Sequence, residues 1–246
     1  MKNIAFFLIL SISLWSEEMD FFSNKLVVVI SQDWQSSRAK LFCLQKKANL
    51  WNVVMSWNVL IGRNGLGWGR GIELPVKRQG PEKKEGDGKA PAGLFALRRI
   101  LYGYNPVAPS NIVWPYKQMT SCHIGVDDPA SSYYNQILDK TTIPQPDWNS
   151  YEEMKRNDIL YQWLLVVEHN TQDIRSGAGS CIFFHLTKNS FSPTAGCTAM
   201  KEKELLSMVE WLGEEPKPLL LQLPFPVYNS LRKQLTRENL PLLEEN

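Results

Sequence analysis

Residues 180–200, "SCIFFHLTKNSFSPTAGCTAM", place a short apolar run ahead of a Gly-Cys pair that leads into further apolar residues. The run ends at His185, and Cys197 follows Gly196 on the far side of a polar loop. Short runs rich in β-branched and aromatic side chains predict strands. The cysteine behind the glycine has three interpretations: a nucleophile, half of a disulfide, or a small apolar residue in a core.

The residues beside Cys197 can supply what a nucleophilic thiol needs, namely a favoured thiolate, a base and donors aimed at an oxyanion. Thr198 is predicted to cap a helix that begins near Met200, so the partial positive charge of the helix N-terminus would stabilise the thiolate. Gly196 permits a sharp turn that exposes backbone N–H groups, and His185 is the candidate base. The spacing alone also fits a packed junction, so the alternatives stay open.

Similar strand-like runs recur along the chain and are separated by Gly, Pro and Asn. They cover residues 25–31, 39–45, 51–57, 93–100, 163–170, 180–186 and 218–223. This pattern predicts a mostly β fold. The stretch 62–92 is rich in Gly, Lys and Pro and is predicted to form long loops, which is where functional sites are often placed.

Two segments have helical periodicity, which adds a minor α component. The first follows Cys197 and ends at Gly213, and the second covers residues 227–238. The apolar residues at helical spacing are Leu205, Met208, Val209 and Leu212 in the first and Val227, Leu231 and Leu235 in the second. Repeats and low-complexity linkers are absent from the sequence, so one domain is expected over residues 17–246, with its core at about 26–223.

The composition argues for a folded globular protein and against a nucleic-acid partner. Of the 246 residues, 43% are hydrophobic, which suffices for a sizeable core. The 27 basic and 25 acidic side chains are scattered, so the sequence has no basic stripe of the kind that binds phosphate backbones. We expect a monomer.

The N-terminus resembles a secretory signal peptide. A lysine precedes an apolar stretch from Ile4 to Trp15, with serines at possible cleavage positions, so residues 1–16 are predicted to be removed and the protein to be exported to the periplasm or cell envelope. Four cysteines are too sparse for a disulfide scaffold. Whether Cys122 and Cys181, or Cys43, form a bridge stays open.

Other constellations of polar residues are weaker. The histidines lack ligand-like spacing, so neither a metal nor another cofactor is predicted. Asp87 and its flanking glycines are interpreted as a tight turn into the strand that follows. Glu168, His169 and Asn170 end a strand that is expected to lie beside the strand of His185, so a supporting or substrate-facing role is predicted for them.

Several motifs in order resemble the L,D-transpeptidase catalytic domain family, the YkuD type. "HLTKNSFSPTAGCTAM" (185–200) resembles its signature of His, a variable loop, Ser or Thr, commonly His, then Gly and Cys. "KKEGDGKAPAGLF" (83–95) looks like its Gly-Asp-Gly-x-Thr-Pro-x-Gly run, and residues 127–135, 166–170 and 177–185 are weaker matches. The resemblance covers about residues 26–223. It implies a β-sandwich or barrel-like domain with a helix after the cysteine and a C-terminal helix.

The resemblance implies cysteine-dependent acyl transfer on peptidoglycan stem peptides. Cys197 would attack the carbonyl of the third stem residue, expel D-alanine and form a thioester that an amine acceptor resolves as a 3-3 cross-link. His185 would act as the base, oriented by the carbonyl of Leu186, and the N–H groups of Gly196 and Cys197 would hold the oxyanion. Thr194 is expected to contact the substrate.

Two departures from the family pattern bear on this expectation. Ala195 stands where a histidine is common, which leaves His185 as the base. Ala195 itself is expected at a substrate-binding position. Ala199 stands where Asn or Arg is frequent. Two alternatives therefore accompany the transferase: an L,D-carboxypeptidase in which water is the acceptor, and a catalytically silent wall-binding module.

Overall fold

The computed structural model describes residues 24–48, 50–189 and 191–243. The predicted signal peptide, residues 1–16, lies outside the described residues. Within these residues, eleven of the fourteen strands form one large mixed sheet in the order β4-β5-β14-β1-β2-β3-β13-β12-β11-β6-β7. The predicted mostly β fold with two α-helices is confirmed.

The large sheet contains both long and very short strands. The long strands alternate apolar and polar residues or are apolar throughout, as half-buried and fully buried strands require. Its strands are β1 (Lys25–Ser31), β2 (Arg38–Lys47), β3 (Leu50–Leu60), β4 (Leu66–Trp68), β5 (Ala90–Ala96), β6 (Leu101–Gly103), β7 (Tyr116–Gln118), β11 (Leu164–Val166), β12 (Phe183–Leu186), β13 (Thr198–Met200) and β14 (Leu219–Pro224).

Two helices pack against this sheet. The helix α1 (Glu202–Leu212) buries the predicted face of Leu205, Met208, Val209 and Leu212 in the main hydrophobic core. The helix α2 (Phe225–Gln234) follows β14 directly, with Pro226 in its first turn, where proline's missing N–H costs no hydrogen bond. A short 3-10 turn, Thr236–Glu238, continues the chain after α2.

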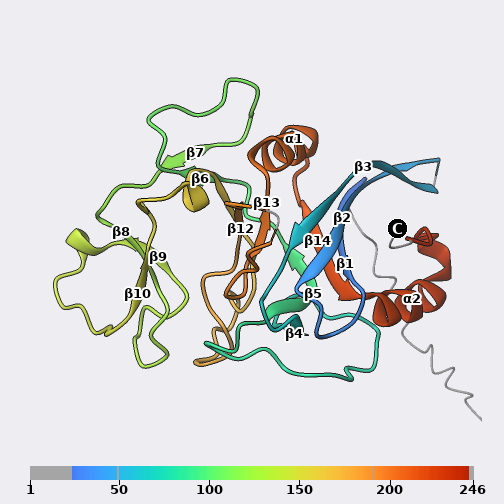
Figure 1. Cartoon of the computed structure of the whole chain (residues 1–246), viewed down its shortest axis with the longest axis horizontal. Coiled ribbons are helices and arrows are strands. Elements are labelled where there is room, and N and C mark those ends of the chain that lie inside the picture. The colour runs from blue at the N-terminus through green and yellow to red at the C-terminus, as the bar shows by residue number, and fades with distance from the viewer. Residues whose placement is uncertain (1–23, 49, 190, 244–246) are drawn as a thin grey trace, which may run out of the picture.

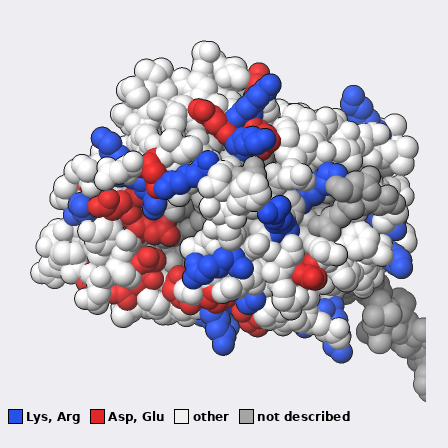
Figure 2. Space-filling model, in the orientation of Figure 1, with Lys and Arg blue, Asp and Glu red and all other residues white. Residues whose placement is uncertain are grey.

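A second, three-stranded sheet forms a lobe at one end of the molecule. It consists of β8 (His123–Val126), β9 (Ile137–Asp139) and β10 (Tyr151–Glu153), with 3-10 turns at Lys140–Thr142 and Ile159–Tyr161. Figure 1 shows this lobe on one side of β12 and β13, with β1, β2 and β3 on the other. Acidic side chains gather over the lobe in Figure 2. Within the large sheet, β12 and β13 therefore lie between the acidic lobe and the strands β1, β2 and β3.

Several element boundaries differ from the sequence-based prediction. The strand predicted at 163–170 ends at Val166, because the chain turns at Asn170, whose φ of 55° lies in the left-handed region. The stretch 62–92 is not all loop, since β4 lies within it and β5 begins in it. The C-terminal helix is two residues longer at its start and ends at Gln234 instead of 238. The short strands β6 to β10 were not predicted, because three or four residues are too few to show a period.

Candidate active site

The pairing of β12 with β13 brings His185 and Cys197 to one face of the sheet. The two strands are parallel, with Phe184 opposite Thr198 and His185 opposite Ala199. Residues in register project to the same face, and side chains two apart along a strand do so as well. Cys197 immediately precedes β13 and packs in the second hydrophobic cluster with Tyr161, whose ring also packs against the imidazole of His185, so both side chains lie on that side of the sheet. A loop between parallel strands allows this, although twelve residues separate the two in sequence.

His185 is buried and oriented by the backbone. Its side chain is 6% exposed, and its Nδ1 lies 2.7 Å from the carbonyl oxygen of Leu186. A carbonyl only accepts, so Nδ1 carries the proton and the Nε2 lone pair is available. Burial lowers the pKa of His185 to about 4. The ring of Tyr161 packs against the imidazole with centroids 5.5 Å apart. The histidine is thus a neutral imidazole in a fixed orientation.

The Cys197 thiol is 7% exposed and held by two backbone groups. The Phe183 N–H donates to Sγ at 3.3 Å, and the thiol donates to the carbonyl of Cys181 at 3.5 Å. Burial, and then the negative charge of Glu152, raise the pKa of Cys197, while the Phe183 N–H and Lys83 act in the opposite direction. The thiol is therefore protonated at neutral pH, so the site holds a neutral Cys and His pair before substrate binds.

The turn that presents Cys197 is organised by Thr194. Its hydroxyl donates to the Cys197 carbonyl at 2.6 Å and accepts from the Gly196 N–H at 3.1 Å. Its backbone bonds to Ile61 and Arg63 tie the turn to the end of β3. The Thr194 hydroxyl is therefore used inside the turn, and the substrate contact expected for Thr194 stays a prediction. The Gly196 N–H is likewise engaged, which leaves the Cys197 N–H as the candidate oxyanion donor.

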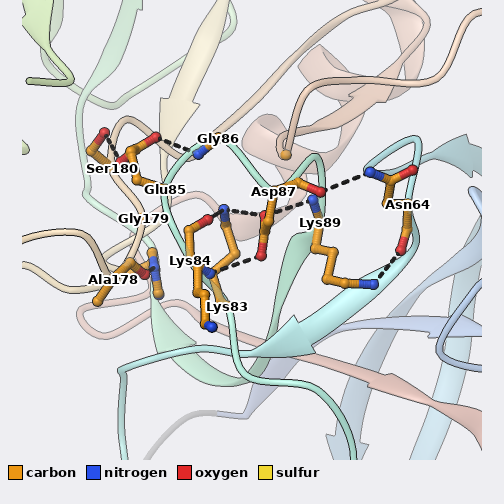
Figure 3. A network of polar contacts seen from close by, with 12 residues as sticks. Asn64, Lys83, Lys84, Glu85, Gly86, Asp87, Lys89, Ala178, Gly179 and Ser180 are labelled. Carbon is orange, nitrogen blue, oxygen red and sulfur yellow. Dashed lines mark hydrogen bonds and ion pairs between the residues drawn. The ribbon is translucent and has the colours of Figure 1, made fainter.

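A second turn, around Asp87, packs beneath the Gly196 turn. Asp87 accepts from the Lys83 ammonium at 2.7 Å and from the backbone N–H groups of Lys84 and Lys89 at 2.8 and 2.9 Å (Figure 3). A Cβ added at Gly196 would lie 3.0 Å from the Lys89 carbonyl oxygen. The predicted tight turn is confirmed, and it brings a buried cation, Lys83, close to the nucleophile's turn.

Two carboxylates that the sequence did not reveal lie on the side of the lobe: Glu152, on β10, and Glu85, in the loop before β5. Glu152 accepts from the Tyr161 hydroxyl at 2.5 Å, and burial raises the pKa of Glu152. Glu85 accepts from the hydroxyls of Tyr134 and Ser180. These carboxylates come from segments far apart in the chain, so no local pattern could have identified them.

His169 and Asn170 are buried and hydrogen-bonded to neighbouring segments. The His169 ring is 1% exposed, and both nitrogens are used: Nδ1 accepts from the Arg70 N–H at 3.1 Å and Nε2 donates to the Ala178 carbonyl at 3.0 Å. Asn170 is fully buried and bonds to Arg70, Arg175 and Gly179. These hydrogen bonds connect the end of the 163–170 segment to the chain before β12, and the supporting or substrate-facing role stays a prediction.

The helix prediction beside the cysteine was wrong in its start. Thr198 lies in β13, and its hydroxyl donates to the Gln222 side chain at 3.0 Å. The helix begins only at Glu202, after Lys201, whose N–H donates to Glu204 at 3.0 Å. The macrodipole acts mainly within the first turn, so it does not reach Cys197. The Phe183 N–H, which donates to Cys197 Sγ, is instead a group that acts to lower the pKa of the thiol. Ala195 is exposed, and Ala199 is buried between β12 and β3.

The described residues contain neither a disulfide nor a cluster of metal ligands. All four cysteines are free thiols, so neither Cys122 with Cys181 nor Cys43 forms a bridge. Within the described ranges, no group of three His, Cys, Asp or Glu side chains is placed to hold a metal ion. No helix in the described part of the chain has the length and apolar character needed to span a bilayer.

Comparisons with known proteins give one family match. The model of the L,D-transpeptidase catalytic domain, YkuD, matches residues 35–220. The solved structure of Bdellovibrio bacteriovorus Bd1075 is similar at 12% sequence identity and a TM-score of 0.41, covering 87% of this chain and 55% of that chain. The chain thus spans little more than half the length of that protein. No curated protein matches the sequence.

Proposed function

Since the chain belongs to the L,D-transpeptidase catalytic domain family, we propose that it is an exported cysteine acyltransferase acting on peptidoglycan stem peptides. The observation that carries this proposal is the orientation of His185. Its Nδ1–H is held by the Leu186 carbonyl, which leaves Nε2 as a proton acceptor on the face that also carries Cys197. A nucleophile, a base and a group that orients the base are the parts that acyl transfer requires.

The reaction begins from the neutral pair. Cys197 Sγ attacks the carbonyl carbon of the third stem residue while His185 Nε2 takes the thiol proton, and the Cys197 N–H stabilises the oxyanion. The tetrahedral intermediate collapses to a thioester as His185 returns the proton to the departing amine of D-alanine. An amine from a second stem then attacks the thioester, loses a proton to His185 and releases the thiolate, which recovers that proton.

Burial serves this mechanism in two ways. A thiol with a raised pKa resists oxidation and unwanted alkylation, since the thiolate is the reactive form. A base with a pKa of about 4 is fully neutral, and so able to accept a proton, throughout the range of ordinary growth media. Proton transfer to His185 during attack, instead of a preformed thiolate, is therefore the activating step.

The experiment that tests the nucleophile is the intact mass of the protein after exposure to a carbapenem. A single covalent adduct is expected on the wild type and none on Cys197→Ala. Glutamine at position 185 keeps the size of the ring but cannot act as the base, so His185→Gln should form the adduct at least 100-fold more slowly. An adduct that persists in Cys197→Ala would overturn the assignment.

The acceptor is determined by product analysis. Incubation with a purified tetrapeptide-bearing muropeptide should give 3-3 linked dimers if the acceptor is an amine. Tripeptide products alone would identify the L,D-carboxypeptidase, with water as the acceptor. No turnover by a folded wild type that binds the muropeptide would favour the silent wall-binding module. Detection of the mature N-terminus in the secreted protein tests the predicted export.

A further inference from the structure

One row of residues crosses four strands of the large sheet and links the base to two cations. His185 is in register with Ala199, Ala199 with Leu60, and Leu60 with Arg38. Residues in register share a face of the sheet, so the Arg38 side chain projects from the face that carries His185. Lys40, two residues further along β2, projects from the same face.

A groove of about 530 Å³ lies along this row. Its lining includes Arg38 and Lys40 from β2, Asn58 from β3, and Ala199 and Lys201 at the end of β13. Ala199 therefore belongs both to the groove and to the residue pair with His185. Ala199 is in register with His185 and follows Cys197 by two residues, so the β13 end of the groove lies one strand from His185, and the groove extends from there over β3 and β2.

The groove carries a surplus of positive charge. Lys201 is paired with Glu204 at 3.9 Å, and Glu204 also lines the groove. Arg38 and Lys40 have no acidic partner among the described residues, and both side chains lie near aromatic rings: Arg38 is 5.8 Å from the Phe191 ring centroid and Lys40 is 5.6 Å from that of Phe42. Ring contacts leave the hydrogen-bond donors of both cations available to a ligand.

The two sides of the nucleophile thus differ in charge. Glu152 and Glu85 stand on the side of the lobe, and Arg38 and Lys40 stand on the side of β2. A carboxylate is repelled by the first side and attracted by the second. The guanidinium of Arg38 can bind a carboxylate in a bidentate manner, and Lys40 supplies a second charge-assisted donor.

We propose that this groove, the Arg38–Lys40 groove, is a subsite for carboxylate groups of the acyl-donor peptide. The proposal rests on the proposed function, since it takes the donor's scissile carbonyl to lie at Cys197. The subsite orients the donor: its carboxylate lies over β2 and β3, and its reacting carbonyl lies between His185 and the Cys197 thiol. The groove thereby distinguishes a peptide with a free carboxylate from one in which that group is an amide.

The test compares two synthetic tetrapeptide stems, one with a free internal carboxylate and one with the carboxamide at the same position. The Arg38→Ala/Lys40→Ala variant should raise KM for the carboxylate peptide about 10-fold with kcat changed less than about twofold, because charge-assisted contacts made equally in ground and transition states are lost. The same variant should leave KM for the carboxamide peptide unchanged. Arg38→Lys, which keeps the positive charge, should raise KM for the carboxylate peptide less than the Arg38→Ala/Lys40→Ala variant does.

Lys233→Ala, which removes an exposed cation from α2, is the matched control and should change neither KM. If the Arg38→Ala/Lys40→Ala variant raised KM equally for both peptides, or raised it for neither, the proposed subsite would be overturned. Calorimetric titration of both peptides into the folded Cys197→Ala protein gives the same comparison without turnover. A wild type that forms no carbapenem adduct contradicts the proposed function, whereas a normal adduct with no carboxylate preference contradicts the groove alone.

Discussion

The Nδ1 atom of His185 lies 2.7 Å from the backbone carbonyl oxygen of Leu186, the next residue along β12. This contact fixes the tautomer without any carboxylate, because a carbonyl oxygen can accept a hydrogen bond but cannot donate one. It leaves Nε2 as the acceptor, while burial, which lowers the pKa of His185, keeps the imidazole neutral. The proposed mechanism follows from this orientation, and the pH behaviour follows from the burial of the ring.

The activity should persist in mildly acidic solution. His185 must be neutral to take the thiol proton, and its pKa is lowered to about 4 by burial. The acid limb of kcat/KM should therefore lie near pH 4, well below the 6.5 of a free imidazole. A profile of kcat/KM between pH 3.5 and about 8 checks this. An acid limb near the ordinary histidine value would show that the free enzyme does not bury the base.

The nucleophile should react slowly with simple alkylating agents. Cys197 is buried with a raised pKa, whereas Cys122 is half-buried. Iodoacetamide at neutral pH is expected to label Cys122 at least about 10-fold faster than Cys197, since only accessible thiolate reacts. Peptide mapping by mass spectrometry over time measures both rates in one sample. Faster labelling of Cys197 would indicate a thiolate formed before substrate binds.

Replacement of Glu152 by glutamine should make Cys197 more reactive. The negative charge of Glu152 raises the pKa of the thiol, and Glu152→Gln keeps an acceptor for the Tyr161 hydroxyl. A roughly threefold or greater rise in the alkylation rate of Cys197 at pH 8 is expected. Glu153→Gln, an exposed neighbour on β10, is the control. An unchanged rate would show that Glu152 is already protonated in the native protein.

Removal of Asp87 should destabilise the fold. The Lys83 side chain is 4% exposed and pairs with Asp87 at 2.7 Å, so Asp87→Ala leaves a buried ammonium without its counter-charge. The free energy of unfolding should fall by about 3 kcal/mol or more. Urea denaturation measures it, with the exposed Lys84→Ala as a control that should change it by less than about 0.5 kcal/mol. The free energy of unfolding should fall less in Lys83→Met/Asp87→Ala than in Asp87→Ala. An equal fall in both variants would contradict the charge argument.

Stability should fall as the pH drops from 6.5 towards 4. Burial lowers the pKa of His169 to about 4, as it does for His185, so the unfolded chain binds these protons at higher pH than the native protein does. Each histidine should cost on the order of 2 kcal/mol between pH 7.5 and 5. Urea denaturation at both pH values tests this. His169→Gln should be less stable at pH 7.5 but lose less on acidification; an unchanged loss would exclude His169 as a contributor.

Much of the fold was predictable because its determinants are local. The apolar runs of β1, β2 and β14 and the four-residue spacing in α1 are each visible within a short window. The short strands β6 to β10 were missed because three or four residues carry no period, and their pairing depends on distant partners. The start of α1 was misplaced because Thr198 is a good cap in isolation, whereas in the protein its hydroxyl bonds to Gln222, which is distant in sequence.

The sequence by itself determined which groups are available for chemistry: a Gly-Cys pair, a histidine at 185 twelve residues ahead of the cysteine, and the ordered motifs, one of them around Asp87, that indicate the family. Only the tertiary structure decided how those groups are arranged. The register of β12 with β13 sets His185 opposite Ala199, two residues after Cys197, and the same row continued through β3 to β2 places Arg38 on that face of the sheet, three strands from His185. The tertiary structure also buries His169, which on sequence alone stood as a candidate to face the substrate. Register is set by contacts between strands far apart in the chain, and no local pattern contains that information.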